Sequence, residues 1–173
     1  MKRRGRTDAV SVLVTRLPGA PRGPRRSRLV AALCAAVHLA AGGGPVCVDV
    51  VWSSDRRMRE LNRRHARRGG TTDVLAFAED VIDPETGRRR LGEIVCNLDL
   101  ARASSRRLGI AYEAEAVLYA THGFVHLLGG RDDAPAGRRE MRRIELASLA
   151  EAGLRVGGGE WDRPRPAAVE TPG

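Results

Sequence analysis

Two histidines four residues apart, His122 and His126, are the residues whose types and spacing point most directly to chemistry. They lie in an apolar run that begins near Tyr112 and stops at Gly129-Gly130. This pattern predicts a helix, because glycine ends helices readily. Side chains at positions i and i+4 of a helix lie on the same face. The two imidazole rings could therefore bind one metal ion.

The turn after this predicted helix offers a third ligand. Asp132 lies six residues after His126, and Asp133 provides a second carboxylate that a shift of one residue would bring to the same place. A His-x3-His-x5-Asp pattern supplies three ligands from a helix and a turn and leaves coordination positions open, as catalytic metal sites do. Histidines on a helix face are also common as packed or hydrogen-bonded core residues, and the spacing alone leaves that alternative open.

The elements that would position these side chains follow from hydrophobic periodicity, glycines and capping residues. Strands are expected at residues 9–14, 46–52, 71–77 and 91–98. Helices are expected at residues 29–41, 55–65, 99–108 and 112–128, and from Pro135 onward. The apolar stripe of the last helix is expected to consist of Met141, Ile144, Leu146 and Leu149.

The apolar segment at residues 29–41 follows three arginines and is similar in pattern to a secretory signal. Its thirteen residues are too few to span a bilayer. We favour a core helix, because a predicted strand precedes the segment and cleavage after it would discard that strand. Three scattered cysteines favour reduced thiols in the cytoplasm over a disulfide framework.

Length and composition predict one domain at residues 1–156, followed by a disordered tail at residues 157–173. The tail is inferred from its Gly, Pro, Arg and Glu content, which does not build a core. Hydrophobic residues make up 42% of the chain but aromatic residues only 3%. The core must therefore consist mainly of Leu, Val, Ile and Ala.

The chain carries a formal net charge of +9, and nearly all of its cations are arginines. Guanidinium groups pair bidentately with phosphate, which favours a polyanionic partner such as RNA. A GC-rich genome would explain the choice of arginine over lysine but not the net excess. The basic cluster at residues 63–68 is the candidate phosphate-binding segment. Its alternative is a solvated helix end, where cations suit the helix dipole.

Three sequence blocks, in order, resemble the YbeY family of bacterial rRNA maturation factors. The first is Met-Arg-Glu-Leu-Asn at residues 58–62, followed by Thr-Thr-Asp-Val-Leu-Ala-Phe at residues 71–77. The second is Leu-Gly-Glu-Ile-Val at residues 91–95. The third and most specific is His-Gly-x-x-His-Leu-x-Gly at residues 122–129. The resemblance covers the chain from about Val46 to Leu149.

The resemblance implies a single α+β domain, with a small mixed sheet of about four strands packed against helices and the metal site on a helix and the following turn. It implies a single-strand-specific, metal-dependent endoribonuclease that acts in rRNA maturation and ribosome quality control. We expect one Zn²⁺ per chain, with Mn²⁺ or another divalent ion as the alternative. The expected partners are rRNA and the small ribosomal subunit in the cytoplasm, without a membrane and without DNA.

Site residues carried over from the family fall into three groups. The metal ligands would be His122, His126 and Asp132. The catalytic residues would be His122, His126, Arg64 and Arg67. The RNA-binding residues would be Arg63, Arg64, Arg67 and Arg68.

Two positions depart from the family pattern. Asp132 stands where the family usually has a histidine, and its charge makes the bound ion a weaker Lewis acid with some preference for harder metals. Ala66 stands where the family tends to carry an arginine, so that Arg64, Arg67 or Arg68 would have to reach the same phosphate.

Two other functions remain as alternatives. One is a non-catalytic ribosome-associated factor with a structural metal. The other is a metallopeptidase-like hydrolase, which Gly123 disfavours because zinc peptidases carry a glutamate general base directly after the first histidine. The candidates for a general base are His65, Asp133 or a metal-bound hydroxide.

Overall fold

The computed structural model describes residues 9–40, 44–65, 70–156 and 168–170. The strands are β1 (Val10–Arg16), β2 (Val46–Ser53), β3 (Val74–Ile82), β4 (Arg89–Asn97) and β5 (Ala168–Glu170). The helices are α1 (Arg26–Leu39), α2 (Asp55–His65), α3 (Leu98–Leu108), α4 (Tyr112–Leu127) and α5 (Pro135–Glu151).

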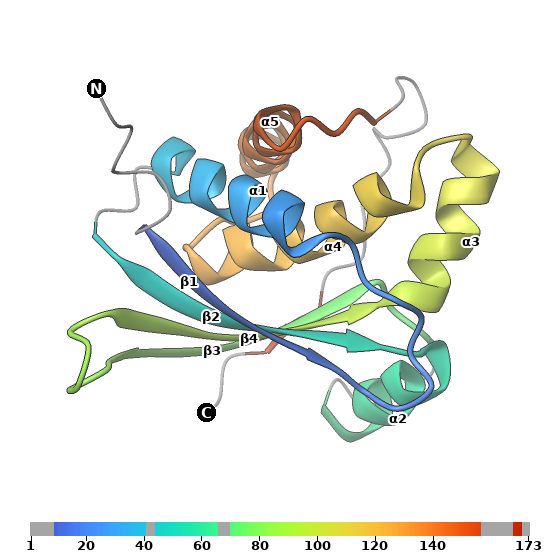
Figure 1. Cartoon of the computed structure of the whole chain (residues 1–173), viewed down its shortest axis with the longest axis horizontal. Coiled ribbons are helices and arrows are strands. Elements are labelled where there is room, and N and C mark those ends of the chain that lie inside the picture. The colour runs from blue at the N-terminus through green and yellow to red at the C-terminus, as the bar shows by residue number, and fades with distance from the viewer. Residues whose placement is uncertain (1–8, 41–43, 66–69, 157–167, 171–173) are drawn as a thin grey trace.

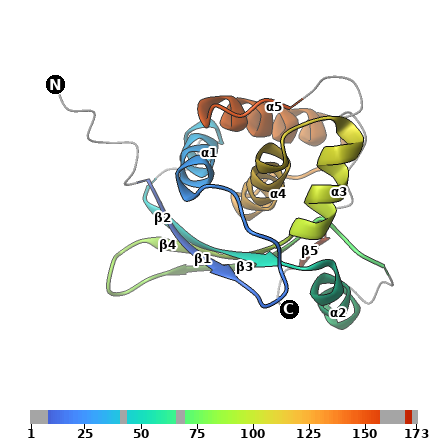
Figure 2. The same cartoon turned by 45° about the vertical axis from the view of Figure 1, so that its right-hand side comes forward.

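The five strands form one mixed sheet in the order β1-β2-β4-β3-β5. Strands β1, β2 and β4 run parallel, β3 is antiparallel to β4, and β5 pairs parallel with β3. Helices α1, α4 and α5 lie on one side of the sheet, and α2 lies on the other (Figures 1 and 2). The α+β fold and the four longer strands of the expected mixed sheet are therefore confirmed.

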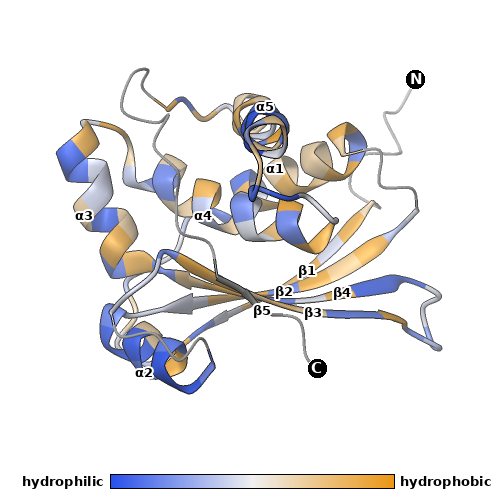
Figure 3. Ribbon diagram, turned by 180° about the vertical axis from the view of Figure 1, so that it is seen from behind, coloured by the Kyte–Doolittle hydropathy of each residue, from blue (hydrophilic) through white to orange (hydrophobic). Residues whose placement is uncertain are grey.

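Two hydrophobic layers hold the sheet between the helices. The larger core joins α1 and α4 to one face, where Val74, Ala76 and Ile94 are buried. A smaller cluster packs Met58 of α2 with Leu75 on the other face. Figure 3 shows hydrophilic residues gathering on α2 and toward the β3–β4 hairpin.

Helix α1 packs into the core, as expected for an internal helix. Leu29, Ala32 and Leu33 are buried there, and α1 packs against α4 and α5. Within the described residues, none of the helices is both long enough and apolar enough to cross a bilayer.

The expected tail at residues 157–173 contributes the short strand β5 at residues 168–170. Its other residues lie outside the described part of the chain. One detail of the predicted α5 stripe is wrong. Leu146 is 40% exposed, whereas Glu145 is buried beside Met141 and Leu149.

Candidate metal centre

Helix α4 brings the two histidines of the motif together near its C-terminal end. Nearly all residues of this helix from Ala114 onward are buried, because α4 lies between the sheet, α1, α3 and α5. The Nε2 atoms of His122 and His126 lie 3.2 Å apart, and the two rings are nearly perpendicular, at 87°. The i, i+4 spacing thus brings the Nε2 atoms of both rings together.

Each ring is oriented by a hydrogen bond at its other nitrogen. The Nδ1 atom of His126 lies 3.0 Å from the carbonyl oxygen of Gly130. A carbonyl oxygen only accepts, so Nδ1 must carry the hydrogen. The Nδ1 atom of His122 lies 2.6 Å from Oε1 of Glu145, and a carboxylate likewise accepts. In the neutral form of each ring, Nε2 is therefore the unprotonated nitrogen.

Two unprotonated nitrogens that face one another at 3.2 Å repel, and a cation between them satisfies both lone pairs. With Zn–N bonds of about 2.0–2.1 Å and a tetrahedral angle, two imidazole nitrogens on one ion would lie roughly 3.3–3.4 Å apart. The observed separation is close to this value. The arrangement of His122 and His126 therefore fits one divalent transition-metal ion.

Asp132 completes a group of three side chains that could hold a metal. Its Oδ2 atom lies 3.7 Å from Nε2 of His126, and the three ligand atoms all lie within 4.8 Å of one another. Asp133 instead lies exposed, and Arg131 donates a hydrogen bond of 2.8 Å to it. This contact lowers the pKa of the Asp133 carboxyl. The structure thus brings Asp132 to the histidines and pairs Asp133 with Arg131.

The turn between α4 and α5 requires glycine at two positions. Gly129 has φ +97°, a left-handed conformation that glycine adopts without strain. At Gly130, a Cβ atom would lie 2.8 Å from the carbonyl oxygen of Val125. Arg138 of α5 then donates a 2.9 Å hydrogen bond to the backbone carbonyl of Asp132. These contacts fold the turn back toward the end of α4.

The environment of His126 favours the neutral, ligand-competent ring. Burial lowers its pKa below the usual 6.5, and the neighbouring His122 lowers it further. The Asp132 carboxylate opposes this shift without reversing it. Protons therefore compete with a metal ion for this nitrogen less than they would at an exposed histidine.

Gly123 has a packing role that the sequence did not reveal. A Cβ at this position would lie 2.8 Å from Cγ2 of Ile94 and 3.0 Å from Cγ2 of Val74. The glycine thus permits close contact between α4 and the sheet. The glutamate that zinc peptidases carry at this place would meet the sheet directly.

The predicted arginines are not drawn into this cluster. Arg63 and Arg64 are exposed at the C-terminal end of α2, the helix that packs on the opposite face of the sheet. Among the described contacts, neither arginine touches the histidines or Asp132. Arg67, Arg68 and Ala66 lie outside the described residues. The ring of His65 packs edge-on against Phe77, with centroids 5.2 Å apart.

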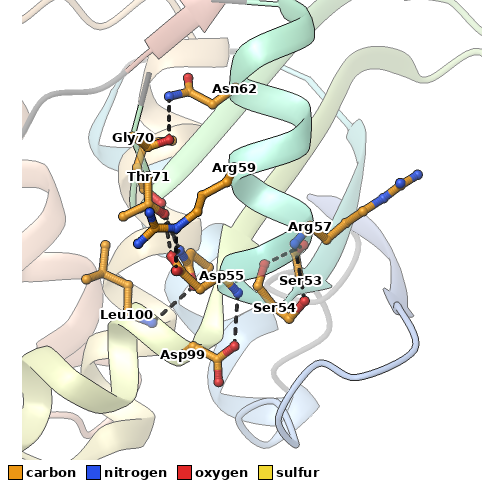
Figure 4. Close-up of polar contacts among 12 residues, drawn as sticks. Ser53, Ser54, Asp55, Arg57, Arg59, Asn62, Gly70, Thr71, Asp99 and Leu100 are labelled. Carbon is orange, nitrogen blue, oxygen red and sulfur yellow. Dashed lines mark hydrogen bonds and ion pairs between the residues drawn. The ribbon is translucent and has the colours of Figure 1, made fainter. Parts of the chain in front are cut away.

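A polar network around the buried side chain of Asn97 fixes the segment that enters β3. The side-chain nitrogen of Asn97 donates to Asp55 and Thr71, each at 2.9 Å, and its oxygen caps α3 by accepting from the Leu100 amide at 3.1 Å. Figure 4 shows the contacts of Asp55 with Thr71 and Arg59. Burial alone would raise the pKa of Asp55, but the hydrogen bonds from Thr71, Arg59 and Asn97 outweigh it and hold the pKa below its usual value.

Two residues near the metal cluster were not predicted as site residues from the sequence, namely Glu145 and Arg142. Oε2 of Glu145 lies 3.5 Å from Nη1 of Arg142, while Oε1 contacts His122. A signal for Glu145 was present, since it lies at i+4 from Met141 and i−4 from Leu149 on the buried side of α5. A carboxylate on an apolar stripe requires a polar partner.

Comparisons with known proteins agree with the motif resemblance. The family model described as Endoribonuclease YbeY matches residues 26–153. A relative named Endoribonuclease YbeY from Desulfitobacterium hafniense is 34% identical over 146 residues, covering 80% of this chain and 92% of the relative. One of the same name from an Anaeromyxobacter species is 36% identical, covering 80% and 73%. A solution structure from Thermotoga maritima shares the fold, with a TM-score of 0.52 at 18% identity, covering 89% of this chain and 100% of that one.

Proposed function

Because the chain belongs to the endoribonuclease YbeY family, we propose that it is a metal-dependent endoribonuclease that cleaves single-stranded RNA. The observation that carries this proposal is the 3.2 Å separation of the two Nε2 atoms, with an acceptor at each Nδ1 and Asp132 beside them. Such a cluster suits a catalytic metal, since three protein ligands leave coordination positions for a substrate.

His122, His126 and Asp132 would hold the ion, for which Zn²⁺ is our first choice and Mn²⁺ the second. A divalent ion at this position would polarise a phosphoryl oxygen or activate a nucleophile. The turn at Gly129 and Gly130 keeps Asp132 close to the histidines. The net charge of +9 would attract the RNA backbone, and the basic segment at residues 63–68 is our candidate for phosphate contacts.

We further propose that the substrate is ribosomal RNA, that the enzyme acts in rRNA maturation and ribosome quality control, and that it works with the small ribosomal subunit in the cytoplasm. The support is the resemblance of the three motif blocks to the family, together with the excess of arginine. Neither alternative function uses all of these features. A structural metal would not require an open ligand set, and a peptidase would need an acid where Gly123 packs against the sheet.

The experiment combines metal analysis with a cleavage assay. The purified full chain is analysed for bound metal and incubated with an end-labelled single-stranded RNA and with the same RNA annealed to its complement. We expect about one metal per chain, cleavage of the single strand, loss of cleavage with chelator, and recovery on adding Zn²⁺ or Mn²⁺.

The control variant is His126→Ala, which removes one ligand and should bind no stoichiometric metal and cleave nothing. Stoichiometric metal in the wild type without any cleavage would favour the non-catalytic factor. Tight metal binding by His126→Ala would mean that the site lies elsewhere. Metal-dependent hydrolysis of casein but not of RNA would favour the peptidase.

A further inference from the structure

We propose that Glu145 is a positioning residue of the metal centre, which holds the His122 ring in the tautomer that presents an unprotonated Nε2, and that Arg142 fixes Glu145 in turn. The inference rests on the metal site proposed above and adds that residues of α5 orient one of its ligands. Glu145 would not touch the metal or the substrate. It would act through His122.

The contact between Glu145 and His122 is short and shielded from water. Nδ1 and Oε1 lie 2.6 Å apart, and each side chain is only 6% exposed. Hydrogen bonds to an ionised group are shorter and stronger than those between neutral groups. A buried carboxylate without partners would be strongly unfavourable, so its place in the core depends on His122 and Arg142.

The two histidines obtain their orientation in different ways. The backbone carbonyl of Gly130 orients His126 within the same helix end and turn. A side chain from another helix, 23 residues away, orients His122. An imidazole can rotate and can carry its hydrogen on either nitrogen. His122 is therefore the ligand whose tautomer depends on the docking of α5 against α4.

Arg142 supplies the second partner of the carboxylate. Its Nη1 atom lies 3.5 Å from Oε2 of Glu145, and its side chain is 21% exposed. Because Arg142 and Glu145 lie at i and i+3 on α5, the helix itself sets their distance. The resulting chain of contacts runs from Arg142 through Glu145 to His122 and ends at the metal cluster.

The central variant is Glu145→Gln, which preserves shape but removes the charge and can present an amide donor to Nδ1. Carboxylate partners of metal-binding histidines typically contribute about 10–100-fold to metal affinity. We expect Glu145→Gln to lower zinc affinity by about that factor. The matched control is Glu140→Gln, the same change on the same helix, where the carboxylate is exposed and pairs with Arg143 at 2.7 and 2.9 Å. We expect it to bind zinc as the wild type does.

Two readouts are needed, and neither uses nuclease activity. Zinc affinity is measured by competition with a chromophoric chelator. The imidazole tautomers of the metal-free protein are measured by long-range ¹H–¹⁵N NMR. We expect hydrogen on Nδ1 of His122 in the wild type and in Glu140→Gln, and an increased Nε2–H population in Glu145→Gln.

Several outcomes would overturn the proposal. An Nε2–H tautomer of His122 in the wild-type protein would do so without any variant, which matters if Glu145→Gln does not fold. A folded Glu145→Gln with zinc affinity within twofold of wild type would also do so. Reduced affinity with an unchanged tautomer would leave Glu145 a packing residue only.

The failure of this inference can be told apart from failure of the proposed function. If the wild type and Glu145→Gln bind zinc equally well, the metal site stands but Glu145 has no positioning role. A wild-type chain that binds no metal contradicts the metal-dependent function itself.

Arg142→Gln tests the outer contact, between Arg142 and Glu145, and should lower zinc affinity less than Glu145→Gln does. An equal or larger loss would contradict the order of the chain of contacts.

Discussion

The Nε2 atoms of His122 and His126 face one another at 3.2 Å, while the Nδ1 atom of each ring is held by an acceptor, Glu145 in one case and Gly130 in the other. Both acceptors select the same tautomer. As a result, two lone pairs converge at one buried point, and a divalent ion there would replace a repulsion with two bonds.

Removing the carboxylate of Asp132 should weaken metal binding more than removing that of Asp133. Asp132 lies 3.7 Å from His126, whereas Asp133 is exposed and pairs with Arg131. Zinc titrations of Asp132→Ala and Asp133→Ala would measure the difference, with a loss of at least tenfold expected only for Asp132→Ala. The reverse order would make Asp133 the ligand. Equal affinity in both variants would mean that the third ligand lies outside this turn.

Changing Asp132 to histidine should preserve metal binding and shift catalysis to lower pH. A neutral imidazole in place of a carboxylate leaves the bound ion more positive, so the nucleophile that it activates loses its proton more readily. The rate of RNA cleavage is measured against pH for the wild type and Asp132→His. We expect the alkaline rise of the profile to begin at lower pH in the variant, and an unshifted profile would contradict this view of Asp132.

The metal-free protein should lose stability as the pH falls below about 6.5, the usual pKa of histidine, because of His126. Burial and His122 lower the folded-state pKa of His126, so in this range the unfolded chain binds a proton that the folded chain resists. The free energy of unfolding therefore decreases as the pH decreases, until the pH passes below the folded-state pKa. The test is urea unfolding in chelator for wild type and His126→Gln across this range. Parallel pH curves for the two proteins would show that His126 is not the cause.

Replacing Asn97 should destabilise the fold by about 2–4 kcal/mol, because the change removes the cap of α3 and the hydrogen bonds of a fully buried amide. Asn97 is fully buried and contacts Asp55, Thr71 and the Leu100 amide. Asn62→Ala is the control, since Asn62 is also buried but makes one 3.2 Å bond, to the Gly70 carbonyl, among the described contacts. In denaturant unfolding, the midpoint of Asn97→Ala should be well below that of Asn62→Ala. Similar midpoints would contradict a structural role for the network.

RNA binding should weaken steeply with salt, because phosphate contacts release counterions. Each arginine that contacts a phosphate contributes about 0.7 to the slope of log affinity against log salt for a single strand. We expect Arg63→Ala and Arg64→Ala to reduce that slope, and Arg143→Ala, whose side chain pairs with Glu140, to leave it nearly unchanged. An affinity that does not vary with salt would exclude an electrostatic contribution.

The sequence by itself determined the features that depend on neighbouring residues. The i, i+4 spacing and the terminal glycines predicted α4 and the meeting of His122 with His126. Hydrophobic periodicity, glycines and capping residues located the other helices and the four longer strands. These features were predictable because helix faces, caps and left-handed turns arise from contacts within a few residues.

The tertiary structure decided what depends on contacts between distant segments. The α5 stripe was expected to bury Leu146, yet Glu145 is buried because His122 of α4 offers it a hydrogen bond. Which of Asp132 and Asp133 lies near His126 depended on how the turn folds against Arg131 and α5. The side of the sheet that α2 occupies likewise separates Arg63 from the histidines. Periodicity alone cannot predict such outcomes, because the free energy of burying a charged or polar group is set by the partner that packing brings to it.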